Sequence, residues 1–316
     1  MENNQKNSDR NAITRKIIFL SALVICLFPF VSPPIALLLG IIIAQFIEHP
    51  YAHLNQKATH FLLQISVVGL GFGMNVSAAL RAGKEGFLFT VVSIFGTLTL
   101  GYFLGKILKI NRKTSYLIST GTAICGGSAI AAVSPVIKAE EKQISIALGT
   151  VFILNSVALF LFPFIGEQLH LSQSQFGLWC AIAIHDTSSV VGAASKYGNE
   201  ALQIATTVKL ARALWIIPVA FLSSLAFKSK DKKIKIPYFI GLFVVAIIVN
   251  TYVPFVQKIS SSIVEISKIG LTLTLFLIGS GLSKKNLSSV GVMPIIQGLI
   301  LWIVISVATL LTILYA

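Results

Sequence analysis

Long apolar runs separated by short polar loops make up most of the chain. Several runs reach the roughly 20 residues that a helix needs to cross a bilayer, while those at 33–47 and 236–250 are shorter. The pattern predicts an all-α polytopic membrane protein with about 9–11 membrane segments. The predicted segments are 16–31, 33–47, 58–80, 86–108, 114–137, 142–165, 174–195, 201–226, 236–250, 262–282 and 288–314.

The polar start of the chain contrasts with everything that follows it. Residues 1–15 are expected to form a disordered cytoplasmic tail, and residues 16–316 a single transmembrane domain. Only 11% of residues are charged, against about 25% in a soluble domain. The net charge of +14 could suggest nucleic acid, but the basic residues lie in short loops. That is the positive-inside pattern of a cytoplasmic membrane protein, so no nucleic-acid partner is expected.

A polar stretch interrupts the apolar run at 174–195. It reads CAIAIHDTSSVVGAAS and places five polar residues in a row at 185–189, and it has a near-copy, AICGGSAIAAVSP, sixty residues earlier. The polar matches at this offset are Ser128 with Ser188, Glu140 with Glu200, and Gln143 with Gln203. We therefore expect two motif repeats, at 114–165 and 174–226, and such paired interruptions point to a transporter's binding site.

A second repeat has an offset of 201 residues. Gln64-Ile65-Ser66 with Gly69 is matched by Glu265-Ile266-Ser267 with Gly270, and each lies after one of the two short segments. Together the two offsets predict two related halves, with the order of segments permuted in one of them.

The loop charges bear on how the motif segments thread the membrane. If both are re-entrant, the basic loop 138–142 is cytoplasmic and the loop 166–173 is outside; two full crossings would reverse this. We expect broken or re-entrant segments that enter from opposite sides, which makes the sixty-residue repeat inverted. Under either arrangement the N-terminus is inside and the C-terminus outside.

Small and polar residues in the two motifs are candidate ligands for a substrate. Glycines let a helix break at depth, and the backbone N–H groups that it frees can bind an anion. The expected substrate-binding residues of the motifs are Cys125, Gly126, Gly127, Ser128, Thr187 and Ser188. The alternative is that the small residues only allow helices to pack closely.

Lys209 and Arg212 lie three residues apart, and so on one helix face, inside an apolar run. Each costs roughly 2.5–3.5 kcal/mol near the bilayer centre on insertion scales. We expect both to bind substrate, or to meet Asp186; the alternative for Lys209 is that it snorkels to an interface. Asn155 is a candidate lining residue or a helix–helix contact. Glu265 is interpreted as a structural residue near a helix start.

His185 and Asp186 are candidate coupling residues. The imidazole could titrate near neutral pH, and the carboxyl could hold a proton, help bind sodium or pair with a cation. A disulfide framework or metal cluster is not expected, because the three cysteines Cys26, Cys125 and Cys180 all lie in apolar segments. No cofactor is expected.

Four motifs carry a family resemblance. AICGGSAIAA, IHDTSSVVGAAS, VKLARALWIIPV and the closing LFLIGSGLSKKNL resemble the YeiH-type family, uncharacterised proteins of the bacterial inner membrane that are catalogued as sulfate exporters. The resemblance runs from Pro33 to the C-terminus. It implies a place in the superfamily of cation:proton antiporters and anion transporters, with inverted repeats and broken helices that meet at mid-membrane. Nothing in these residues identifies sulfate.

The sequence thus predicts a secondary transporter for a small anion such as sulfate, sulfite or an organosulfonate, exported by coupling to protons or sodium. A cation/proton antiporter is the rival within transport, but cation sites need clustered oxygen ligands and Asp186 is the one acid deep in a motif. An intramembrane hydrolase would need His185 and Asp186 to form an oriented pair, which neighbours in sequence do not readily form, so no enzyme is expected. Lipid and a second copy of the chain are further expected partners.

Overall fold

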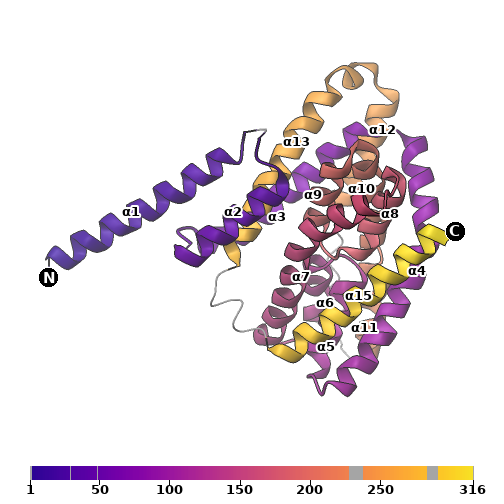
Figure 1. Cartoon of the computed structure of the whole chain (residues 1–316), viewed down its shortest axis with the longest axis horizontal. Coiled ribbons are helices and arrows are strands. Elements are labelled where there is room, and N and C mark those ends of the chain that lie inside the picture. Colours follow the sequence, from indigo (N-terminus) through magenta and orange to yellow (C-terminus); the bar gives the residue numbers. More distant parts are fainter. Residues whose placement is uncertain (1, 29, 48, 228–237, 283–290, 316) are drawn as a thin grey trace.

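The computed structural model describes residues 2–28, 30–47, 49–227, 238–282 and 291–315. Every regular element in these ranges is a helix, as predicted (Figure 1). The elements are α1 (Glu2–Ile25), α2 (Pro33–Phe46), α3 (Ala52–Leu70), the 3₁₀ helix η1 (Gly71–Gly73), α4 (Val76–Ile107), α5 (Arg112–Ala123), α6 (Gly127–Val136), α7 (Glu141–Gln168), α8 (Gln173–Ala183), α9 (Thr187–Tyr197), α10 (Asn199–Ala213), α11 (Ile216–Ala226), α12 (Tyr238–Tyr252), α13 (Pro254–Gly281) and α15 (Val292–Tyr315).

Length and apolar character allow five helical stretches of the described chain to cross a membrane. They are Gly86–Ile107, Lys142–Gln168, Asn199–Ala226, Pro254–Gly281 and Val292–Tyr315. Their outward faces carry large apolar side chains, such as Phe103 and Phe164, as expected for helices that face lipid. The prediction of an all-α polytopic membrane protein is therefore confirmed.

The segment predicted at 58–80 is not one straight helix. α3 and the start of α4 meet at an angle of 110°. Met74 and Asn75 have extended backbones at the bend, and the Asn75 side chain accepts a hydrogen bond from Ala78 N, which starts α4. A capped helix start in the middle of an apolar run explains why hydrophobicity alone did not reveal the bend.

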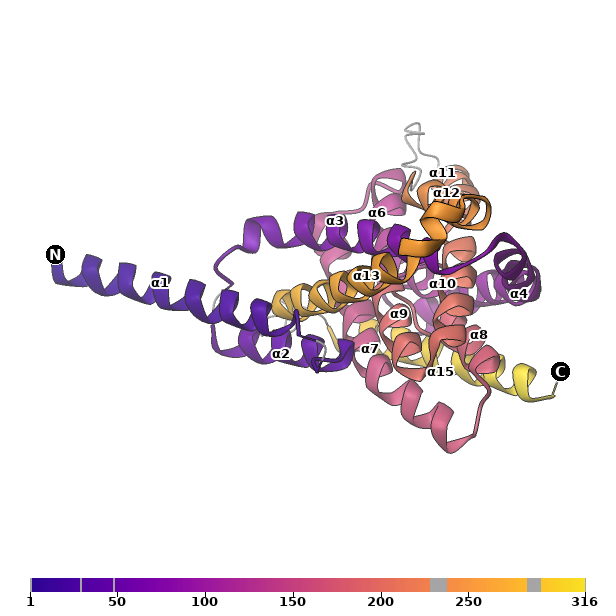
Figure 2. The ribbon, with the colours of Figure 1, turned by 90° about the horizontal axis from the view of Figure 1, so that it is seen from above.

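The N-terminal residues differ from the prediction of a disordered tail over 1–15. Residues 2–15 are the first turns of α1, which projects away from the bundle in two perpendicular views (Figures 1 and 2). The helix continues without a break from the apolar segment that follows, and a continuous helix satisfies its own backbone hydrogen bonds without tertiary contacts. Its apolar end is anchored, since Phe19 and Cys26 are buried in one cluster with Ile43 and Phe276.

α2 crosses α13 at two glycines. A Cβ placed on Gly40 would come within 2.8 Å of Ser280 N, and one placed on Gly279 within 3.0 Å of Ile41 N. Backbones can approach this closely only where side chains are absent, as at other small-residue crossings in membranes. α13 also packs against α3, and α12 packs against both, so the two short predicted segments, now α2 and α12, belong to a unit with α3 and α13.

The interior of the bundle is formed by the two motif segments. Residues 117–126 and 179–194 are continuously buried. They pack against α4, α7, α10 and α15, which carry four of the five long apolar spans. The polar motifs of the sequence are therefore at the centre of the molecule.

Candidate functional site

The first motif folds as a hairpin, α5 and α6, that enters and leaves at one end of the bundle. Lys113 Nζ, near the start of α5, donates a hydrogen bond of 2.6 Å to Lys138 O, just beyond α6. Gln143 Nε2 likewise donates to Asn111 Oδ1, the N-cap of α5, over 3.1 Å. We call α5–α6 the first hairpin and its open side the Lys113 end.

The second motif forms a matching hairpin, α8 and α9. Gln173 Oε1, at the start of α8, accepts a hydrogen bond of 3.0 Å from Glu200 N, just after α9. Tyr197 OH donates to Leu171 O over 2.7 Å. This second hairpin opens at the Gln173 end. α7, a single 28-residue helix, connects the two ends. The sequence predicted two re-entrant segments that enter from opposite sides. In agreement with this, the two hairpins open at opposite ends of α7.

The tips of the two hairpins touch. Gly126 turns the first tip with a φ of +66°, a conformation that side chains rarely allow. A Cβ on this glycine would lie 3.4 Å from both His185 C and Asp186 Cα at the second tip. The two breaks that the repeat predicted are thus packed backbone against backbone.

Polar side chains fix the second tip. Asp186 is the N-cap of α9: its carboxylate accepts hydrogen bonds from Ser189 N, over 3.3 Å, and from the Ser188 hydroxyl. Asn155 Oδ1, on α7, accepts a hydrogen bond of 3.1 Å from His185 N. Asp186 therefore has a structural role in addition to any part in coupling.

Lys209 and Arg212 of α10 reach the ends of the half-helices at these tips. Lys209 Nζ donates to Ala181 O at 3.3 Å and to Ile184 O at 2.7 Å. Arg212 Nε donates to Ala123 O at 2.7 Å and its Nη1 to Ile182 O at 3.1 Å. Carbonyl groups at a helix C-terminus lack partners within the helix and carry partial negative charge, so cations stabilise them.

These contacts bear on two expectations. Both cations donate to backbone carbonyls of α5 and of the second hairpin and not to Asp186, while their binding of substrate stays a prediction. The snorkelling alternative for Lys209 is wrong, because its side chain is 0% exposed and its ammonium points to the interior. Such carbonyls leave no sequence signal, because every residue has one.

Several buried polar atoms at the tips have no hydrogen-bond partner. Arg212 uses Nε and Nη1 but not Nη2; Asn155 uses Oδ1 but not Nδ2; and neither ring nitrogen of His185 is bonded. Thr122 Oγ1, in the last turn of α5, is also unpaired. Leaving a buried donor without a partner costs about 1–3 kcal/mol, so these groups are candidates for binding a polar ligand.

The charges at the tips do not balance. Only three buried side chains of the described residues are formally charged, namely Asp186, Lys209 and Arg212. All three lie at the hairpin tips, so the buried interior carries one positive charge in excess. Burying an uncompensated charge is costly, and an anion would remove that cost.

The remaining predicted residues lie around the same point. Gly127 and Ser128 begin α6 and are half-buried, and no side chain caps this helix. Cys125, Thr187 and Ser188 are buried at the two tips. The structure thus brings all of the predicted substrate and coupling residues to one place.

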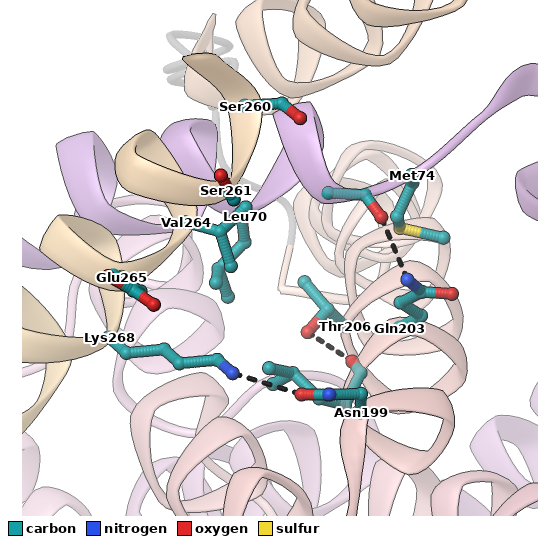
Figure 3. Close-up of a pocket in the computed structure, with 12 residues that line it drawn as sticks. Leu70, Met74, Asn199, Gln203, Thr206, Ser260, Ser261, Val264, Glu265 and Lys268 are labelled. Carbon is teal, nitrogen blue, oxygen red and sulfur yellow. Dashed lines mark hydrogen bonds between the residues drawn. The ribbon is translucent and has the colours of Figure 1, made fainter. Parts of the chain in front are cut away.

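A second feature was not predicted, a pocket between α10 and α13 with a volume of about 290 Å³ (Figure 3). Lys268 Nζ reaches across it and donates to Asn199 Oδ1 over 3.0 Å. Glu265 also lines it. This residue lies about three turns into α13, which begins at Pro254, so the prediction that it is near a helix start is wrong. One signal was present: Asn199, Gln203 and Thr206 make a polar stripe on one face of α10.

Comparison with known proteins gives a family but no activity. The family described as conserved hypothetical protein 698 matches residues 15–298. A relative from Bacteroides thetaiotaomicron is 58% identical over 283 residues, covering 89% of this chain and 86% of its own. One from Porphyromonas gingivalis is 52% identical over 98% of this chain and 97% of its own. A third, from Geobacter sulfurreducens, is 45% identical over 94% and 95%. All three are named UPF0324 membrane proteins, and no solved structure matches the chain.

Proposed function

The chain belongs to the conserved hypothetical protein 698 family of UPF0324 membrane proteins, and we propose that it is a secondary transporter that carries a small anion across the bacterial cytoplasmic membrane. The anion binds between the tips of the two re-entrant hairpins. Membrane transporters commonly place substrate at mid-membrane, where discontinuous helices of inverted repeats meet. Arg212 lies at the middle of the candidate span Asn199–Ala226, which supports this depth for the tips.

One observation carries the proposal: the tips hold an excess positive charge together with unpaired donors. Arg212 Nη2 and Asn155 Nδ2 are hydrogen-bond donors that have no acceptor, and a His185 ring nitrogen can serve as a third. An oxyanion supplies several acceptors and a negative charge at once. The same charge excess disfavours a cation as the substrate, which argues against a cation/proton antiporter.

The half-helices add to this preference. The start of α6 at Gly127 and Ser128 has no side-chain cap, so its N–H groups are available to an anion. The C-terminal ends of α5 and α8, at Ala123 and Ala183, carry partial negative charge. The positive charges of Arg212 and Lys209 offset it. Sulfate, sulfite and organosulfonates are the oxyanions that we favour, and export is the direction that we propose from the family resemblance.

His185 and Asp186 are the proposed coupling residues, for a proton or for sodium. His185 has two unpaired ring nitrogens, and Asp186 lies beside it at the same tip. An anion and a coupling ion bound at neighbouring atoms would stabilise each other.

The orientation that we propose follows from the basic residues at the Lys113 end, which make that end cytoplasmic. These residues are Lys106, Lys109, Arg112, Lys113, Lys138 and Lys142. The N-terminus is then inside, and the C-terminus, at the end of α15, is outside.

Ligand-induced stabilisation of the purified protein tests the function. We expect sulfate, sulfite, ethanesulfonate or a small carboxylate to raise the unfolding temperature, since a ligand at 100 times its Kd adds about 2.7 kcal/mol. Asn155→Asp should abolish this effect. It keeps the acceptor for His185 N, removes the Nδ2 donor and supplies the missing negative charge.

Asn111→Asp is the matched control. The Asn111 side chain makes three hydrogen bonds, and Oδ1 accepts all of them, from Lys113 N, Thr114 N and Gln143 Nε2. The aspartate therefore adds the same charge without disturbing these bonds. It lies at the Lys113 end of α5, away from the tips. Equal anion stabilisation in the wild type and in Asn155→Asp would refute the proposed site.

A further inference from the structure

We infer that the α10–α13 pocket is the vestibule through which the anion reaches the hairpin tips from the Gln173 end, and that Lys268 draws the anion into it. This inference rests on the proposed function. It assigns a route and a selectivity residue to a cavity that lies apart from the tips.

The polar face of α10 connects the pocket to the site. Three residues of α10 that line the pocket become more buried along the helix: Asn199 is exposed, Gln203 is half-buried and Thr206 is buried. These positions are four and three residues apart, and three more residues lead to Lys209 on the same face. An anion that reaches Thr206 is therefore one helical turn from a cation at the tips.

Lys268 is the cation of the pocket. It is half-buried on α13, and its ammonium spans the pocket to Asn199 on α10, a neutral partner, in a solvent-exposed hydrogen bond (Figure 3). Glu265, one turn earlier on α13, is exposed, and solvent therefore weakens its field. The deeper of the two charges is positive, which favours the entry of anions.

The pocket also lies between two different units. α10 holds the cations of the tips, whereas α13 packs against α2 and α3. The bond between Lys268 and Asn199 joins these units across the pocket. Breaking that bond would widen the path between α10 and α13 without disturbing the contacts at the tips.

Thiol labelling of Thr206→Cys tests the route. Thr206 is 1% exposed and donates to Leu202 O, yet it lines the pocket, so a small methanethiosulfonate should modify the cysteine that replaces it. Thr272→Cys is the matched control, because Thr272 is 6% exposed and donates to Lys268 O but does not line the pocket. The native cysteines Cys26, Cys125 and Cys180 are buried, which keeps the background low.

Reagent charge tests the role of Lys268. We expect the anionic sulfonatoethyl reagent to modify the Thr206→Cys variant faster than the cationic trimethylammonium reagent does. Adding Lys268→Gln should reduce that preference about 3- to 10-fold, and adding Glu265→Gln should increase it. An unchanged preference with Lys268→Gln would overturn the assignment of Lys268.

The modified protein separates failure of the route from failure of the function. Once the Thr206→Cys variant carries the sulfonatoethyl group, the anion found in the stabilisation experiment should bind at least about tenfold more slowly, because the group fills the path. Unchanged binding, or a Thr206→Cys variant as unreactive as Thr272→Cys, would overturn the route alone. If no anion stabilises the unmodified protein, the proposed function itself fails.

Discussion

Ser66 on α3 lies directly against Gly270 on α13. A Cβ added to Gly270 would collide with Ser66 Oγ, and one added to Gly69 would collide with Ser267 Oγ. The offset of 201 residues relates Ser66 to Ser267 and Gly69 to Gly270, so the same contact occurs twice with its partners exchanged. A two-fold axis generates such reciprocal contacts. The repeated sequence on α3 and α13 is therefore also a structural repeat.

This contact predicts a rescue. Gly270→Ser should destabilise the protein by about 1–3 kcal/mol, because the new side chain has no room beside Ser66. The double variant Ser66→Gly/Gly270→Ser should recover most of that loss by exchanging the two side chains. Thermal unfolding measures both, with Gly241→Ser as the control, since a Cβ at Gly241 meets nothing within 4 Å. Additive losses in the double variant would contradict the reciprocal packing.

The hairpin tips were predictable because their residues break the apolar pattern. The turns fall at Gly126 and at His185-Asp186, inside the two motifs that the sixty-residue repeat identified. Glycine and a capping carboxylate disfavour continuation of a helix, so their positions are local properties of the sequence. The loop charges then favoured re-entry from opposite ends, and the hydrogen bond from Lys113 to Lys138 O shows that the first hairpin begins and ends at the same end of the bundle.

Two features of the structure could not be predicted, because each depends on contacts between residues far apart in the sequence. The burial of Lys209 and Arg212 could be expected from their apolar surroundings, but their acceptors are carbonyls of distant residues. The α10–α13 pocket likewise joins Asn199 to Lys268, which only the packing of α13 brings together. The helical spacing of polar residues on α10 indicated which face of that helix is polar, but it did not indicate that α13 lies across the pocket from this face.

Gly126→Ala should weaken both the fold and the site. The φ of +66° at this position strains any residue with a side chain, and the new Cβ would lie 3.3 Å from Val151 Cγ1, a tight contact. We expect a loss of about 1–3 kcal/mol in unfolding free energy and the loss of anion-dependent stabilisation. Gly96→Ala, where a Cβ meets nothing within 4 Å, should be neutral or stabilising. An alanine variant at Gly126 that still responds fully to the anion would show that the tips need not touch.

Substitutions of Arg212 should separate its two roles. Arg212→Gln leaves Ala123 O and Ile182 O without their charged donor, and we expect it to cost about 3–5 kcal/mol. Arg212→Lys keeps the charge but loses the fork, so it should fold better and still lose anion binding, which depends on the free Nη2. Unfolding curves with and without anion check both variants, and wild-type stability in Arg212→Gln would contradict the structural role.

The orientation of the hairpins can be tested at the two ends of α7. Gln168 and Lys142 are both exposed and lie at opposite ends of this helix. A cysteine at Gln168 should react with an impermeant thiol reagent added to intact cells, and one at Lys142 only after the membrane is permeabilised. The reverse pattern would place the basic Lys113 end outside.

The last prediction concerns the coupling ion. An anion bound beside His185 stabilises the protonated imidazole, so proton uptake should accompany binding and affinity should fall as pH rises. His185→Gln should flatten this dependence. Asp186→Asn should preserve the cap of α9, because asparagine also accepts from Ser189 N, and should remove any contribution of the carboxylate. If sodium is the coupling ion, affinity should instead follow sodium at constant pH and be lost in Asp186→Asn. Measuring anion affinity over pH, with and without sodium, distinguishes these outcomes, and indifference to both would show that His185 and Asp186 only shape the tip.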